Sequence, residues 1–172
     1  VGLADSAYEE LLGTEQAVWS ARLAAESDNL LTALRYALEA NQIEALLRIV
    51  TGVWRFRWQR GALRDTLDWL ETGLARASDV PPLVRTRALR AAGVLAMGLN
   101  QYARAHQLLE MALEDALLAE SSYDHGSART NLGMVLREQG DFDAACAHLE
   151  ASAALMRTLE NPARVKFPLI IL

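Results

Sequence analysis

Apolar residues recur along most of this chain at spacings of three and four, with polar residues between them. This spacing places apolar side chains on one face of a helix, whereas a half-buried strand would show strict alternation. The pattern predicts helices near residues 15–26, 28–40, 43–59, 62–77, 83–98, 102–119, 125–139 and 142–159, and a last one that begins near residue 163. Pro81-Pro82 and Asn161-Pro162 break the pattern, because proline cannot continue a helix.

The pattern itself repeats. Three segments that begin at Gly61, Asn100 and Gly140 align without a gap, so the period is 39 and then 40 residues. Each segment continues with an aromatic residue or leucine, a small residue three positions on and a leucine four positions later. These are Leu63, Thr66 and Leu70, then Tyr102, Ala105 and Leu109, then Phe142, Ala145 and Leu149. Such internal repeats are typical of arrays in which each unit packs on the next.

We interpret each unit as a hairpin of two helices. Gly and Asn at the start of the aligned segments tolerate a positive φ at a helix C-terminus and therefore allow a tight reversal. Gly93 and Gly133 lie seven residues before Asn100 and Gly140, and they would allow the first helix to pack closely against the second.

The predicted fold is therefore all-α, a right-handed superhelical array of antiparallel hairpins with a period of about 40 residues. Residues 1–41 form N-terminal helices that lead into the array, residues 42–161 form three hairpins, and residues 162–172 form the truncated first helix of a fourth repeat. Because both ends of the chain look cut, we expect a fragment of a longer protein. The apolar run from Phe167 to Leu172 predicts fraying or self-association at the C-terminus.

The second and third units resemble the tetratricopeptide repeat (TPR). Leu132-Gly133 and the pairs Tyr102/Phe142, Ala105/Ala145 and Leu109/Leu149 occupy the positions that this motif prescribes. The early tryptophan of the motif is absent, and the period exceeds the usual ~34 residues. The resemblance implies an α-solenoid that mediates protein–protein interactions, with the first helix of each unit lining a concave groove.

The N-terminal half resembles a segment of large bacterial signalling ATPases of the STAND class, which include LuxR-type and AfsR-like transcriptional regulators. The resemblance is carried by the run from Glu15 to Leu38 and by Val53-Trp54-Arg55-Phe56, Arg60-Gly61 and Asp68-Trp69-Leu70-Glu71. It implies a regulatory arm of a cytoplasmic signalling protein. The chain has no Gly-x-x-x-x-Gly-Lys-Ser/Thr loop, so we expect no nucleotide chemistry in this region.

Charge and composition narrow the possible partners. The net charge of −5 argues against binding to nucleic acid or to an anionic membrane surface, both of which favour basic proteins. No apolar run approaches the length of a membrane span. The single cysteine, Cys146, excludes an intrachain disulfide, favours a reducing compartment, and lies in an alanine-rich stretch that predicts a small core residue.

No constellation of catalytic or metal-binding residues is present. His106, His125 and His148 are isolated in the sequence, and one cysteine cannot complete a zinc site. We therefore predict no enzyme activity, no metal and no cofactor. The four tryptophans are expected to pack the first hairpin against the N-terminal helices, with an aromatic ligand cage as the alternative. They are Trp19, Trp54, Trp58 and Trp69.

The groove positions of TPR arrays predict a partner-binding surface that contains five arginines. Its residues would be Arg48, Arg55, Trp58, Arg87, Arg90, Met97, Thr130, Met134 and Arg137. Because arginine binds carboxylates with paired hydrogen bonds, we expect the groove to accept an acidic peptide, a protein segment or another domain of its own chain. The arginines could instead pair with acidic residues of neighbouring helices. A second possible function is a small-molecule sensor with an apolar pocket formed by Trp54, Trp58, Met97 and Met134.

Overall fold

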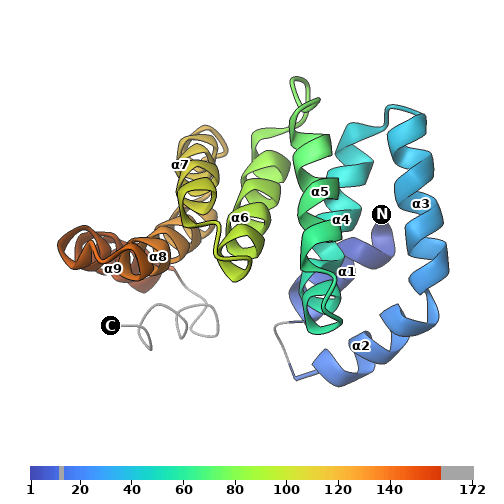
Figure 1. Ribbon diagram of the computed structural model, residues 1–172, viewed down its shortest axis with the longest axis horizontal. Coiled ribbons are helices and arrows are strands. Elements are labelled where there is room, and N and C mark those ends of the chain that lie inside the picture. The colour runs from blue at the N-terminus through green and yellow to red at the C-terminus, as the bar shows by residue number, and fades with distance from the viewer. Residues whose placement is uncertain (12–13, 160–172) are drawn as a thin grey trace.

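The computed structural model describes residues 1–11 and 14–159, and within them every regular element is an α-helix. The array runs across the molecule from α1–α5 at one end to α8 and α9 at the other (Figure 1). The helices are α1 (Gly2–Glu10), α2 (Gln16–Ala25), α3 (Ser27–Glu39), α4 (Ile43–Gln59), α5 (Leu63–Leu74), α6 (Pro82–Gly98), α7 (Tyr102–Leu118), α8 (Ser122–Gln139) and α9 (Phe142–Arg157). The prediction of an all-α solenoid is confirmed.

The helices agree with the predicted ranges to within three residues at each end, with one exception. The exception is α1, which the sequence pattern did not predict. The expected fourth-repeat helix and the expected C-terminal self-association lie outside the described residues. In the part of the chain that the structure describes, no helix is long and apolar enough to cross a membrane.

The turns between paired helices have the predicted left-handed backbone. Gly61, Asn100 and Gly140 have φ values of +77°, +60° and +86° and each follows the first helix of a hairpin. The absence of a Cβ lets glycine adopt this conformation at no steric cost, and asparagine tolerates it. The hairpins are therefore α4–α5, α6–α7 and α8–α9.

Glycine also sets how closely the helices of a hairpin approach, as predicted. A Cβ added to Gly93 on α6 would lie 2.6 Å from Cγ of Leu109 on α7, and one added to Gly133 would lie 2.8 Å from Cγ of Leu149. In the first hairpin the glycine at the close approach lies on the second helix instead of the first. It is Gly73, and a Cβ added to it would lie 2.7 Å from a methyl carbon of Leu47.

Buried leucine and alanine side chains form a continuous core along the array. All four tryptophans are partly buried and pack against this core. Their expected contact with the N-terminal helices stays a prediction, and the ring of Trp58 lies against α6, where a Cβ added to Gly98 would be 2.2 Å from it. Trp54 and Trp58 meet edge to face with ring centres 6.3 Å apart. The expectation for Cys146 is wrong, because its side chain is exposed. On this turn of α9 the side chain that faces the core is that of Ala145, which is 3% exposed.

Candidate protein-binding face

The first helices of the three hairpins, α4, α6 and α8, contact one another in turn and share one surface of the array. The N-terminal helix α1 lies on this surface. We call it the inner face and define it by the residues around α1, namely Arg48, Thr51, Gly52 and Arg55 of α4 and Arg87 of α6.

The backbone of α1 touches α4 at Gly52. A Cβ added to Gly52 would lie 2.2 Å from the carbonyl oxygen of Ala4 and 2.7 Å from its Cβ. Any larger residue at position 52 would therefore push α1 away from the face. Ala4 and Ala7, which are 1% and 0% exposed, bury the side of α1 that faces the array.

An ion pair joins α1 to α4 beside this contact. Arg48 donates from Nη2 to Oδ2 of Asp5 at 2.6 Å and from Nε to Oδ1 at 3.3 Å. The hydrogen bond and the charge of Asp5 raise the pKa of Arg48. Both side chains are 40% exposed, so the pair is worth only about 0–1 kcal/mol of stability.

Tyr8 extends the contact from α4 to α6. Its ring is 7% exposed and lies under two guanidinium groups, with Arg87 at 4.9 Å and Arg55 at 5.5 Å from the ring centre. Arg55 also lies 4.5 Å from the ring centre of Trp54. Cation–π contacts of this kind attract the arginines to the aromatic faces.

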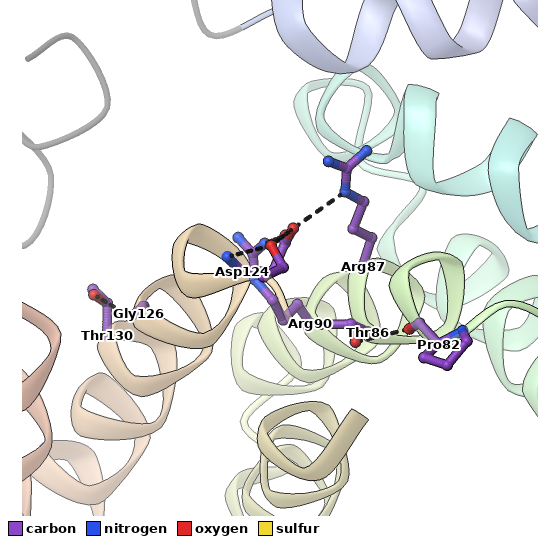
Figure 2. Close-up of polar contacts among 8 residues, drawn as sticks. Pro82, Thr86, Arg87, Arg90, Asp124, Gly126 and Thr130 are labelled. Atoms are coloured by element: carbon purple, nitrogen blue, oxygen red, sulfur yellow. Dashed lines mark hydrogen bonds and ion pairs between the residues drawn. The ribbon is translucent and has the colours of Figure 1, made fainter. Parts of the chain in front are cut away.

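Asp124 binds two of the predicted groove arginines at the N-terminus of α8. Figure 2 shows the side chains of Arg87 and Arg90 reaching from α6 toward this carboxylate. Nη1 of Arg90 lies 2.5 Å from Oδ1, and Nε of Arg87 lies 3.5 Å from Oδ2. The hydroxyl of Ser121, the N-cap of α8, donates to Oδ2 at 2.9 Å.

This cluster is an interior one. Asp124 is 0% and Arg90 8% exposed. Burial by itself lowers the pKa of Arg90, but the neighbouring Tyr8, Asp124 and Tyr123 more than offset this effect, so the pKa is raised. Since Arg90 and Asp124 are both charged and buried, this pair joins the second hairpin to the third and is not a free binding surface, whereas Arg87 also lines the neighbouring pocket.

The remaining predicted groove residues do not form one open patch. Thr130 is buried and bonds to Ser152 of α9 at 2.7 Å, so it points into the third hairpin. The guanidinium of Arg137 is exposed and pairs with the adjacent Glu138. Trp58, Met97 and Met134 are partly buried. The prediction that Arg90 and Thr130 line an open groove is thus wrong, because both side chains are interior.

An open pocket of about 380 Å³ lies between α1, α4 and α6. Its walls include Tyr8, Arg48, Thr51, Leu83, Val84 and Arg87. None of the four apolar residues expected to form a small-molecule pocket belongs to its lining. Asp5 also lines the pocket, so one carboxylate and two arginines face it beside Leu83 and Val84.

The histidines stay apart from this face. His106 of α7 pairs with Glu110 at 3.3 Å and contacts Gln139 at 3.2 Å. Burial and the charge of Arg129 lower the pKa values of His125 and His148. Among the described residues no group of histidine, cysteine and acidic side chains could hold a metal ion.

Sequence reasoning missed α1, which contributes Ala4, Asp5, Ala7 and Tyr8 to this site. A signal was present, since Ala4, Ala7, Tyr8 and Leu11 follow a helical spacing of three and four residues. The signal is weak because the helix is only nine residues long and contains Gly2, which disfavours a helix.

Comparisons with known proteins agree with this architecture. Residues 126–163 match the family model of the tetratricopeptide repeat. The comparison with curated proteins finds no match. The fold is similar to the crystal structure of BtubC (BKLC) from P. vanneervenii, with a TM-score of 0.65 and 20% sequence identity over 83% of this chain. The aligned region spans 59% of the length of that protein. The chain therefore contains a TPR-like helical repeat region, a type of region that generally mediates protein–protein interaction.

Proposed function

We propose that this chain is a non-catalytic protein-binding scaffold whose inner face accepts an acidic segment of a partner. One observation carries the proposal: the face already holds an acidic helix. On α1, Asp5 is bound by Arg48, and the Tyr8 ring lies under Arg55 and Arg87. Arg48, an arginine predicted to bind carboxylates, therefore already binds one within the chain itself.

The surface available to a further protein lies beside α1. With α1 in place it consists of the pocket between α1, α4 and α6 with Arg87 on its wall, and the exposed Arg137 of α8 is a second candidate contact. Met97 and Met134 on the same helices are adaptable apolar side chains that suit a binding surface. Arg90 and Thr130 take no part, because they are buried.

The proposal is tested with a partner purified after capture from the source cell and identified. Its affinity is measured by calorimetry for the chain, for the Arg87→Gln/Arg137→Gln variant and for the control Arg104→Gln/Arg157→Gln. Arg104 and Arg157 lie on second helices, α7 and α9, and are exposed. We expect the first variant to lose about ten-fold or more in affinity and the control to lose little. Equal affinities in the two variants would overturn the proposal.

We further propose that the scaffold is a regulatory arm of a larger bacterial signalling protein of the STAND class. The support is the sequence resemblance between Glu15 and Leu38 and around Trp54 and Trp69. In that setting the acidic segment would belong to another domain of the same polypeptide. Crosslinking of the full-length protein, followed by identification of the residues joined to α6 and α8, tests this placement. Crosslinks that join the array only to other molecules would contradict it.

A small anionic effector is the second candidate occupant of the same face. The observation that favours it is the pocket of about 380 Å³ with Arg48 and Arg87 on its wall, a size within the usual range for small-molecule sites. Thermal melting in the presence of phosphate and of small dicarboxylates tests this candidate. A rise in melting temperature that Arg87→Gln abolishes supports it, and no rise at millimolar ligand excludes it.

A further inference from the structure

Helix α1 is attached to the array as a ligand would be. It packs on α4 and reaches α6 through Tyr8, and its contacts with α2 are few. A helix of nine residues is not stable in isolation, so α1 is helical because the inner face holds it.

Three complementary features fix where α1 lies. The small Ala4 fits over Gly52, the acidic Asp5 reaches Arg48, and the aromatic Tyr8 fits between Arg55 and Arg87. Ala7 is fully buried on the same side of the helix. In sequence order this pattern is small, acidic, any residue, small, aromatic, and it describes a helix rather than an extended peptide.

The contacts that hold α1 are individually weak. The Asp5–Arg48 pair is exposed to solvent, whereas the buried side of α1 consists of Ala4, Ala7 and Tyr8, and Leu11 directly after the helix joins the same core. The buried Arg90–Asp124 pair fixes α8 to α6 independently of α1. The face is therefore built from α4, α6 and α8, which contact one another, and α1 lies on it through a separate set of contacts.

We propose that α1 is an intramolecular ligand of the inner face and that it exchanges with a partner helix of the same pattern. The partner helix carries a small residue, an acid, a second small residue and an aromatic residue at the positions of Ala4, Asp5, Ala7 and Tyr8. Such a helix gains the contacts of α1 and displaces it. This inference rests on the proposed function and names both the partner's chemistry and the competitor that regulates its access.

The test separates α1 from the face by single substitutions in the full chain. Ala4→Arg places a long charged side chain where there is room only for a methyl group, so we expect it to expel α1 from the face. Adding Gly52→Leu fills the vacated position on α4. The three nearest atoms to a Cβ at position 52 all belong to Ala4, so the leucine occupies the place of α1 first. Gly2→Ala, a position with nothing within 4 Å, is the matched control.

The probe is a synthetic peptide with the sequence of residues 1–11, added to each protein up to about millimolar concentration, the scale of a tethered competitor. Binding is followed by NMR shifts of the Gly52 and Arg48 signals, and circular dichroism checks that each variant is folded. We expect Ala4→Arg to bind the peptide at least about ten-fold more tightly than the Gly2→Ala control. Gly52→Leu in the Ala4→Arg background should abolish binding, and a peptide with Asp5→Lys should bind more weakly.

Equal binding by Ala4→Arg and the control, or no binding to a folded Ala4→Arg protein, would overturn the exchange of α1. If the identified partner still depended on Arg87 and Arg137 in that case, the proposed function would survive and only the inference about α1 would fall. If the peptide bound as expected but no partner used Arg87 and Arg137, α1 would stand as an intramolecular ligand, and both the proposed function and the exchange with a partner helix would fall.

Discussion

Loss of the Asp124 carboxylate should destabilise the array more than loss of any exposed acid. The substitution Asp124→Ala leaves Arg90, only 8% exposed, without its 2.5 Å partner. Removing one member of a buried ion pair costs about 3–5 kcal/mol, because the remaining charge stays desolvated and unpaired. The variant also loses the hydrogen bond that Ser121 donates at the start of α8.

The matched control is Asp5→Ala. Asp5 also binds an arginine of a neighbouring helix at 2.6 Å, but both of those side chains are 40% exposed. We expect a cost of about 0–1 kcal/mol for this change. The shortest contacts of the two pairs are similar, at 2.6 and 2.5 Å, so the large difference in burial is expected to dominate the difference in cost.

A double variant separates the energy of the ion pair itself from the cost of leaving one unpaired charge buried. The repeat period places Thr130 at the position equivalent to Arg90 and Val84 at the position equivalent to Asp124. The change Arg90→Thr/Asp124→Val therefore installs residues that the chain already uses at these sites. Because the buried charge of Arg90 is removed together with Asp124, and Arg87 is 31% exposed, we expect it to be more stable than Asp124→Ala, with a coupling of about 2–3 kcal/mol in the double-mutant cycle.

Urea unfolding followed by circular dichroism measures all of these variants, with Asp124→Val and Arg90→Thr as the single changes of the cycle. The reasoning fails if Asp124→Ala costs no more than Asp5→Ala, or if the double variant is less stable than both single variants. Either result would mean that Arg90 finds water or another partner when Asp124 is absent.

Three further predictions follow from packing, protonation and exposure. Gly93→Ala should lower the free energy of unfolding by about 1–3 kcal/mol, since its Cβ would lie 2.6 Å from Cγ of Leu109. In urea unfolding, the loss in a variant that also carries Leu109→Ala should be smaller than the sum of the two single losses. Burial and a neighbouring arginine lower the pKa values of His125 and His148, so the folded state binds fewer protons than the unfolded state. Their stabilising effect is complete above the unfolded pKa of about 6.5 and declines below it, so the melting temperature should fall between about pH 7.5 and 5.5, and less so in a His125→Asn/His148→Asn variant. Cys146 is exposed and should react with a maleimide in the native protein, which mass spectrometry detects; a thiol that reacts only in urea would contradict its position on α9.

The elements that could be predicted from the sequence are those with long apolar periodicity and a repeated turn. Gly61, Asn100 and Gly140 predicted the reversals because few residues adopt a positive φ. Gly93 and Gly133 predicted the close approach of paired helices for a related reason, the absence of a side chain. The helix α1 could not be recognised in the same way, because its nine residues have no counterpart in the repeat and its order comes from contacts with α4.

The predicted binding residues show where the repeat pattern stops being informative. Thr51, Arg90 and Thr130 occupy equivalent positions of the three hairpins, and their exposed fractions are 5%, 8% and 4%. The position is thus interior in every unit, and the middle unit accommodates an arginine there only because Asp124 lies at the N-terminus of α8. Gly52 follows Thr51 directly, and because it has no side chain the backbone of α1 packs against it. The period identifies equivalent positions, but only the neighbouring helix determines whether an arginine at such a position binds a partner or replaces a core residue.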